Sequence, residues 1–328
     1  MDSRSAEVVL GRLCVVVIAL VLGACGPGKT APAAWEKSLS PFRVMKENPP
    51  IRKVPIPFRQ DGPPLEAAPA ITPKPLRLLT PTSPPTSVPE HEVEMDIIIV
   101  VDNYPSRPGW ETTWGFSALV EVEGRLLLFD TGGDGPLLLR NLARQDVDPH
   151  SIRQVVISHA HRDHTGGIAS LLSTRGHPEL YLPPDLVEAY RSRYGVRADV
   201  YPGESGKKLS DRVYLTGMVG KAIPEQALIL DHPRGLVIIT GCAHPGVVEM
   251  ARAAKRALHK EPYLVLGGFH LREASDREIH RVIQGLKRLG VEQVGPCHCS
   301  GDRARELFRE GFGAGYLDLG TGQTISLP

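Results

Sequence analysis

Along residues 93–328, the pattern of apolar positions predicts strands first and then strands that alternate with helices. Short apolar runs predict strands at residues 96–101, 116–122, 125–129, 152–158, 236–240 and 263–266. Gly124 separates the second run from the third and predicts a hairpin turn. Apolar residues at helical spacing predict helices over residues 247–258 and 279–289. Hairpins followed by alternating strands and helices indicate a layered α/β domain with mixed sheets.

The first 25 residues have the pattern of a targeting segment. Residues 13–22 are an almost unbroken apolar run, too short to cross a hydrocarbon core of ~30 Å as a relaxed helix. They fit the apolar part of a signal peptide better. Leu22-Gly23-Ala24-Cys25 follows and resembles a bacterial lipobox, in which the cysteine is lipidated and becomes the mature N-terminus. The alternative is an ordinary cleaved signal, or an N-terminal anchor, that happens to contain Cys25.

Residues 26–92 have the composition of a linker. Sixteen of the 30 prolines lie between positions 27 and 89. Proline lacks a backbone donor and restricts the residue before it, so extended chain is expected here rather than helix or central strand. Such a linker would hold the globular domain, residues 93–328, away from a membrane; a proline-motif ligand for a partner is the alternative. The expected location is extracytoplasmic, as a membrane-anchored lipoprotein of a bacterium.

Composition narrows the class of protein without naming a function. Of the 328 residues, 41% are hydrophobic and 23% are charged, as in ordinary globular proteins, which excludes fibrous, wholly disordered and polytopic membrane classes. A net charge of +1 and an aromatic content of 5% give no reason to expect a nucleic acid partner. Five cysteines are too few for a disulfide scaffold.

A histidine cluster carries most of the functional argument: His159-Ala160-His161-Arg162-Asp163-His164 follows the strand predicted at residues 152–158 and precedes a glycine pair. In an extended chain His159 and His161 point to the same side and could hold one divalent ion. Asp163 and His164 project differently and could serve a second ion. Imidazole and carboxylate suit zinc, iron or manganese. A metal-scavenging surface tract is the alternative, but such tracts seldom lie between a strand and a glycine pair.

Three later strand ends each contribute one histidine. They are Gly241-Cys242-Ala243-His244, Gly268-Phe269-His270 and Cys297-His298-Cys299. Open α/β sheets assemble their sites at the carboxyl ends of strands, so these histidines are expected near the cluster. The Cys-x-Cys spacing does not match a zinc knuckle or a redox pair, and we expect Cys297 and Cys299 to be buried thiols that shape the loop.

The His-x-His-x-Asp-His pattern, with Asp130-Thr131-Gly132 about 30 residues before it, resembles the metallo-β-lactamase superfamily. The Gly-Cys-x-His and Cys-His-Cys elements are similar to its subgroup named after 7,8-dihydropterin-6-methyl-4-(β-D-ribofuranosyl)aminobenzene-5′-phosphate synthase. The likeness covers nearly all of residues 95–328. It implies an αββα sandwich of two mixed sheets flanked by helices. It also implies two divalent ions, zinc before iron or manganese, and a role for Asp130 in supporting the ligands by hydrogen bonding.

The resemblance and the strand geometry together imply a ligand set. One ion is expected on His159, His161 and His244, and the other on Asp163, His164 and His298, with Asp163 also orienting the nucleophile. His270 is a further candidate as ligand, substrate donor or supporting group, and could replace His298 in the set. Cys242 stands where relatives hold a bridging carboxylate, as a supporting or substrate-contacting group.

The expected function is that of a metal-dependent hydrolase, in which a metal-activated hydroxide attacks an ester, a phosphodiester or a lactone of small-molecule size. A transferase like the subgroup's namesake is an alternative, against which export past a membrane argues. A non-catalytic metal-binding or metal-sensing lipoprotein is another. Where subgroup members often carry Glu-His-Gly, this chain has Thr113-Trp114-Gly115, so its substrate could differ from theirs.

Overall fold

The computed structural model describes residues 94–327. The predicted signal peptide, the lipidation at Cys25 and the linker at residues 26–92 lie outside these residues. Within the described range, none of the helices combines the length and the apolar character that crossing a bilayer requires.

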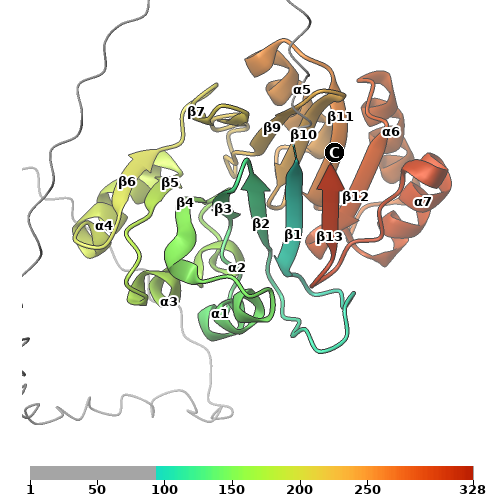
Figure 1. Cartoon of the computed structure of the whole chain (residues 1–328). Helices are drawn as coiled ribbons and strands as arrows, with labels where there is room; N and C mark the ends of the chain where they lie inside the picture. The colour runs from blue at the N-terminus through green and yellow to red at the C-terminus, as the bar shows by residue number, and fades with distance from the viewer. Residues whose placement is uncertain (1–93, 328) are drawn as a thin grey trace, which may run out of the picture. The chain divides into compact units, whose positions relative to one another are not determined.

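Seven strands form the first sheet, in the order β13-β1-β2-β3-β4-β5-β6 (Figure 1). The strands are β1 (Met95–Val101), β2 (Ser117–Val122), β3 (Arg125–Phe129), β4 (Ile152–Val156), β5 (Glu179–Leu182), β6 (Asp199–Pro202) and β13 (Thr324–Leu327). Strands β1, β2 and β3 pair antiparallel, with Gly124 at positive φ in the β2–β3 turn, as the sequence predicts. From β3 to β6 the pairing is parallel, so this sheet is mixed.

Six strands form the second sheet, in the order β12-β11-β10-β9-β8-β7. They are β7 (Lys208–Ser210), β8 (Val213–Leu215), β9 (Leu228–His232), β10 (Gly235–Thr240), β11 (Pro262–Gly268) and β12 (Gln293–Cys297). Strands β10, β11 and β12 are parallel neighbours, and the others pair antiparallel. In the parallel register Thr240 stands beside Gly267 and Gly268 beside Cys297, so the three following loops emerge at one edge.

Helices cover the outer face of each sheet. Figure 1 shows α1 to α4 on the side of the first sheet and α5 to α7 on the side of the second. The helices are α1 (Gly135–Arg144), α2 (Arg162–Thr165), α3 (Ile168–Ser173), α4 (Pro184–Tyr194), α5 (Val247–Leu258), α6 (Asp276–Arg288) and α7 (Asp302–Phe312). Three single turns of 3₁₀-helix lie at Pro149–Ser151, His298–Ser300 and Gly313–Gly315.

The core has three layers of apolar side chains. The central layer joins the two sheets and includes Ile97, Phe129, Leu230 and Leu264, all fully buried. Each outer layer joins one sheet to its own helices. The arrangement is the αββα sandwich of two mixed sheets that the sequence predicts. The central layer explains why strands such as β1 and β10 are apolar at nearly every position: both of their faces are covered.

Candidate metal centre

The short helix α2 divides the histidine cluster into two halves. After β4 the chain bends at His159, and His161 stands immediately before the first residue of α2. Asp163 and His164 lie within the helix, which rotates them away from the first pair. The carbonyl of His161 accepts hydrogen bonds from the N–H groups of His164 and Thr165, which starts the turn. The sequence predicts this division from side-chain alternation, and the helix accomplishes it.

Three imidazoles form the first triad: His159, His161 and His244. Their donor atoms lie within 4.8 Å of one another. His159 Nε2 is 3.0 Å from His161 Nδ1, and the ring of His244 lies 4.8 Å from that of His159 and 4.9 Å from that of His161. His159 is fully buried, while His161 is exposed at the rim. The first triad therefore extends from the buried His159 to the protein surface at His161.

A carboxylate and two imidazoles form the second triad: Asp163, His164 and His298. Asp163 Oδ2 lies 3.7 Å from His164 Nε2 and 3.4 Å from His298 Nε2. Both histidines are buried, and the Asp163 side chain is 22% exposed. The structure thus brings together both sets of residues that the sequence analysis assigned to two ions. Their role as ligands stays a prediction.

The chemistry of both triads fits divalent cations. Within residues 94–327, Nε2 of His244 and Nε2 of His298 are buried without a hydrogen-bond partner, an arrangement that costs free energy unless a further group satisfies them. Burial and the neighbouring imidazoles hold the pKa of His159 well below its ordinary value and lower that of His244 to about 4. Neutral imidazoles offer lone pairs to a metal, and N/O donor sets of this kind suit zinc, iron or manganese.

Asp130 holds the second triad in place through hydrogen bonds. It is fully buried, its Oδ1 accepts from the backbone N–H of Ser158, and its Oδ2 accepts from the Ser158 hydroxyl, both at 2.7 Å. The same Oδ2 lies 2.7 Å from His164 Nδ1. Burial lowers the pKa of His164, but the charge and hydrogen bond of Asp130 outweigh it and raise that pKa. With Nδ1 engaged, Nε2 is the ring nitrogen of His164 that faces the triad, so Asp130 makes the supporting contact that the family resemblance implies.

Glu225 is a functional residue that the sequence analysis missed. It is fully buried, and its Oε1 accepts from the backbone N–H groups of Gly241, Cys242 and Ala243 at 3.1, 2.8 and 2.8 Å. Its Oε2 accepts from the N–H of His244 at 3.0 Å. One carboxylate thus determines the path of the loop that presents His244. An isolated Glu before a strand carries no local pattern from which this role could be inferred.

Asp102 was missed as well, and it holds the opposite loop. Its Oδ2 accepts from the backbone N–H of His298 at 3.0 Å, and its Oδ1 from that of Tyr104 at 2.7 Å. Asn103, next in sequence, places Oδ1 3.1 Å from His298 Nδ1, which leaves Nε2 directed into the triad. Burial raises the pKa of Asp102 to about 6 despite these hydrogen bonds.

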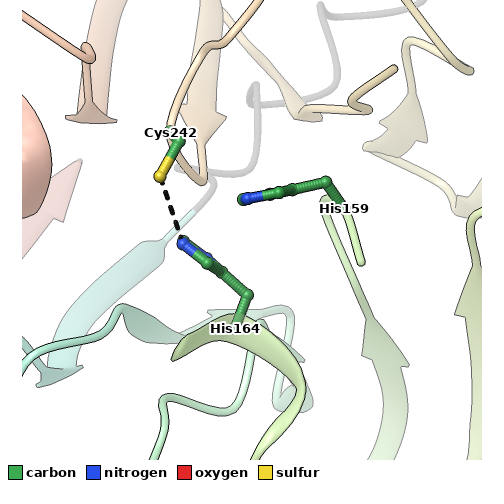
Figure 2. Close-up of side chains that lie close together, drawn as sticks. All are labelled: His159, His164 and Cys242. Carbon is green, nitrogen blue, oxygen red and sulfur yellow. Dashed lines mark hydrogen bonds between the residues drawn. The ribbon is translucent and has the colours of Figure 1, made fainter. Parts of the chain in front are cut away.

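Cys242 lies between the two triads. Its sulfur is 3.2 Å from His164 Nε2, and Figure 2 shows His159 and His164 approaching it from two sides. The three donor atoms lie within 4.8 Å of one another. Cys242 also groups with His270 and Cys299, behind the first triad. The cysteines Cys242, Cys297 and Cys299 are buried and free, as expected for the last two.

His270 lies outside both triads. Its ring is exposed and stands 4.3 Å from that of His244. Its backbone has a φ of 50°, in the left-handed region, and so do those of Asp130 (57°), Ala243 (56°) and His298 (49°). Non-glycine residues seldom adopt this conformation, and such strain gathers at functional sites. Here it occurs at the turns that follow four different strands.

Comparison with known proteins agrees with this geometry. Residues 115–259 match the family model of the metallo-beta-lactamase superfamily. The matched segment contains the histidine cluster and His244, and the superfamily resemblance seen in the sequence is confirmed. His270 and His298 lie beyond the matched segment, on the strand ends that complete the sandwich.

Three known proteins are similar to most of the chain. The 7,8-dihydropterin-6-methyl-4-(beta-D-ribofuranosyl)-aminobenzene-5'-phosphate synthase of Methanocaldococcus jannaschii is 29% identical over 268 residues, which cover 66% of this chain and 91% of the relative. A solved structure, Tm1679, described as a metal-dependent hydrolase of the beta-lactamase superfamily, is 27% identical with a TM-score of 0.59 and matches 70% of this chain and 98% of its own. The metallo-beta-lactamase fold protein YhfI from Bacillus subtilis, 14% identical with a TM-score of 0.54, covers 71% of this chain and 99% of its own and shares the fold.

Cavities border the first triad. One of about 540 Å³ adjoins His161 and is lined mainly by apolar side chains, among them Pro183, Met218 and Ile223. Another, of about 400 Å³, adjoins His244 and contains Lys221. A small molecule could therefore lie against the centre in partly apolar surroundings.

Proposed function

We propose that the protein is a metal-dependent hydrolase that holds two divalent ions, most simply zinc, and cleaves an ester, a phosphodiester or a lactone. The observation that carries this proposal is the pair of triads, each with a buried ring nitrogen that has no hydrogen-bond partner within residues 94–327. Bound ions would supply Lewis acidity and lower the pKa of a water molecule. The name of the 27% identical solved structure, a metal-dependent hydrolase, supports the same class.

The residues of the chain have separate tasks in this proposal. His159, His161 and His244 hold one ion, and Asp163, His164 and His298 hold the other. Asp163 is the partly exposed carboxylate of the centre, so it is placed to accept a hydrogen bond from the attacking nucleophile and orient it. The cavity beside His161 would receive the uncharged part of the substrate and exclude water from it.

A transferase is the second candidate, because the Methanocaldococcus jannaschii relative is named a synthase and is 29% identical. The two activities separate in one experiment. The full chain, loaded with zinc, is assayed with bis(4-nitrophenyl) phosphate and 4-nitrophenyl acetate, and separately for formation of the dihydropterin–aminobenzene compound that the relative's name gives. Metal-dependent release of nitrophenol supports the hydrolase, and transfer without hydrolysis supports the synthase.

Asp163→Asn provides the residue-level test. General acid–base groups contribute roughly 10²–10⁴-fold to rate, so turnover per bound metal should fall at least on the order of 100-fold. Asp211→Asn is the matched control, because Asp211 is an exposed carboxylate paired with Lys208. Two bound ions with no turnover on any ester, phosphodiester or lactone would instead favour the non-catalytic metal-binding lipoprotein.

We also propose that Cys25 carries a lipid that anchors the protein to an extracytoplasmic membrane surface. The apolar run at residues 13–22 and the lipobox-like Leu22-Gly23-Ala24-Cys25 support this location. Mass spectrometry of the mature N-terminus should find a diacylglycerol-modified Cys25. An unmodified mature N-terminus at another residue would contradict it.

A further inference from the structure

Trp114 is exposed beside the second triad, where folding alone gives no reason for it. Its side chain is 45% exposed, although burying an aromatic side chain of this size stabilises a fold. The indole ring centre lies 4.9 Å from that of His298, with the planes inclined by 51°. The indole thus lies against a residue of the centre, and a large part of its side chain is left to solvent.

Arg272 brings a positive charge to the same place. Its guanidinium carbon lies 5.4 Å from the centre of the Trp114 ring, within the range of a cation–π contact. Its side chain is 63% exposed, and its carboxylate partner is the adjacent Glu273, at 4.0 Å and 95% exposed. An ion pair of that length between solvated groups is weak, so the guanidinium keeps most of its capacity to bind an anion.

Both side chains stand on loops that are packed against the centre. Gly115, next to Trp114, has a φ of +141°, and a Cβ there would lie 2.7 Å from the Asp163 carbonyl oxygen. The N–H of Phe116 donates to that same carbonyl at 3.2 Å. On the other side, a Cβ on Gly301 would lie 2.7 Å from the Cα of Arg272. These close approaches fix the backbone that carries the two side chains before any ligand arrives, which lowers the entropy cost of ordering the two loops on binding.

We propose that Trp114 and Arg272 form a substrate subsite for an aromatic phosphate ester, with the aromatic ring stacked on the indole and the phosphate paired with the guanidinium. The proposal rests on the hydrolase function proposed above, since it places the phosphate beside His298. An exposed indole selects a planar ring, because stacking requires a flat partner, and a guanidinium 5.4 Å from the centre of the indole ring selects a ligand that carries negative charge. An aliphatic ester would gain from Arg272 but not from Trp114.

The test compares two probes on the zinc-loaded full chain by isothermal titration calorimetry. Phenylphosphonate and methylphosphonate carry the same anionic group, neither has an ester bond to hydrolyse, and the ring belongs to the first alone. Stacking on an aromatic side chain favours a planar ligand, so phenylphosphonate should bind on the order of tenfold more tightly. Trp114→Ala should abolish that preference and Trp114→Phe should keep most of it. Arg272→Gln should weaken both probes by a similar factor.

Val196→Ala is the control, since Val196 is an exposed apolar residue, 89% accessible, in the turn after α4. It should leave both affinities unchanged, and all variants should retain the metal content of the parent. Equal binding of the two probes by the parent, or a preference that survives Trp114→Ala, would overturn the subsite. Neither probe is turned over, so binding and hydrolysis are measured independently. A protein that prefers phenylphosphonate but hydrolyses no ester would contradict the hydrolase proposal alone. An active hydrolase that binds both probes equally would contradict the subsite alone.

Discussion

The buried Glu225, next to the loop that carries His244, offers the sharpest test of how the fold positions its candidate metal ligands. Glu225 accepts four backbone N–H groups from residues 241–244 and is fully buried. Glu225→Ala would leave four buried donors unpaired, at roughly 1–3 kcal/mol each, and would endanger folding itself. Glu225→Gln is the better change, because it keeps the shape and one acceptor oxygen.

The magnitude for Glu225→Gln follows from these contacts. The amide oxygen can still accept from residues 241–243, but hydrogen bonds to a neutral acceptor have about half the strength of those to a carboxylate. The amide NH₂ then faces the N–H of His244, and that bond, worth about 2 kcal/mol, is lost. Burial raises the pKa of Glu225, which shows that the ionised form is costly there and that removing the charge offsets part of the loss. The free energy of unfolding should fall by about 3 kcal/mol.

Urea unfolding of the metal-free protein, monitored by circular dichroism, measures this difference in the free energy of unfolding. Zinc titration of the folded Glu225→Gln variant should show weaker binding at the first triad. Glu249→Gln is the matched control, because Glu249 is a half-exposed glutamate on α5 that pairs with Arg252. Its unfolding free energy should change by less than about 0.5 kcal/mol. An equally small change for Glu225→Gln would refute the view that this carboxylate organises the loop.

Three further outcomes are expected. His159→Ala should lower the zinc content measured by elemental analysis, while His280→Ala, on the exposed side of α6, should not; equal loss in both would contradict the assignment of His159 to the metal centre. Cobalt-loaded protein should show a sulfur-to-cobalt absorption band, because the Cys242 sulfur is 3.2 Å from His164 Nε2 in the second triad. Cys242→Ser should remove the band and Cys297→Ser should keep it, and the reverse would exclude Cys242 as a donor. Burial raises the pKa of Asp102 from 3.8 to about 6, so folding favours the protonated carboxyl. The stability that this group contributes is full below pH 3.8 and is lost as the pH rises to about 6. The free energy of unfolding should fall by about 3 kcal/mol across this range through Asp102. Asp102→Asn should remove that component from unfolding curves measured across this range, and identical pH profiles would contradict it.

The sequence predicts the parts of this protein that are encoded locally. The strands at residues 96–101 and 125–129 correspond to β1 and β3, and the helical face at residues 247–258 is α5, because buried elements repeat apolar residues at their own period. The six-residue histidine cluster is visible for the same reason: all of its members are neighbours in the chain. The strand predicted at residues 152–158 ends earlier, at Val156. The Val156 carbonyl accepts a hydrogen bond from the N–H of Asp130, the residue that follows β3.

The parts that the sequence does not reveal depend on contacts between distant segments. Asp102 and His298 are 196 residues apart, and a single aspartate after a strand gives no sign of such a contact. Glu225 likewise lies 16 to 19 residues before the N–H groups that it accepts. Helix α2 has only four residues, too few for a periodic pattern, yet it separates Asp163 from His161. Trp114 was noticed as a departure from the subgroup, but its neighbour Arg272 was not.

The three buried carboxylates give the centre a common structural logic. Asp130 binds the side chain of His164, Glu225 binds the loop that carries His244, and Asp102 binds the backbone of His298. Each acid therefore fixes one part of the centre to a different region of the sandwich, and none of them supplies an atom to either triad. Burying three carboxylates is unfavourable unless each is compensated by hydrogen bonds or by positive charge nearby. Metal ions in the triads would supply that charge, so metal binding should stabilise the fold as well as complete the site, and zinc should raise the thermal unfolding temperature of the parent more than that of a His159→Ala variant.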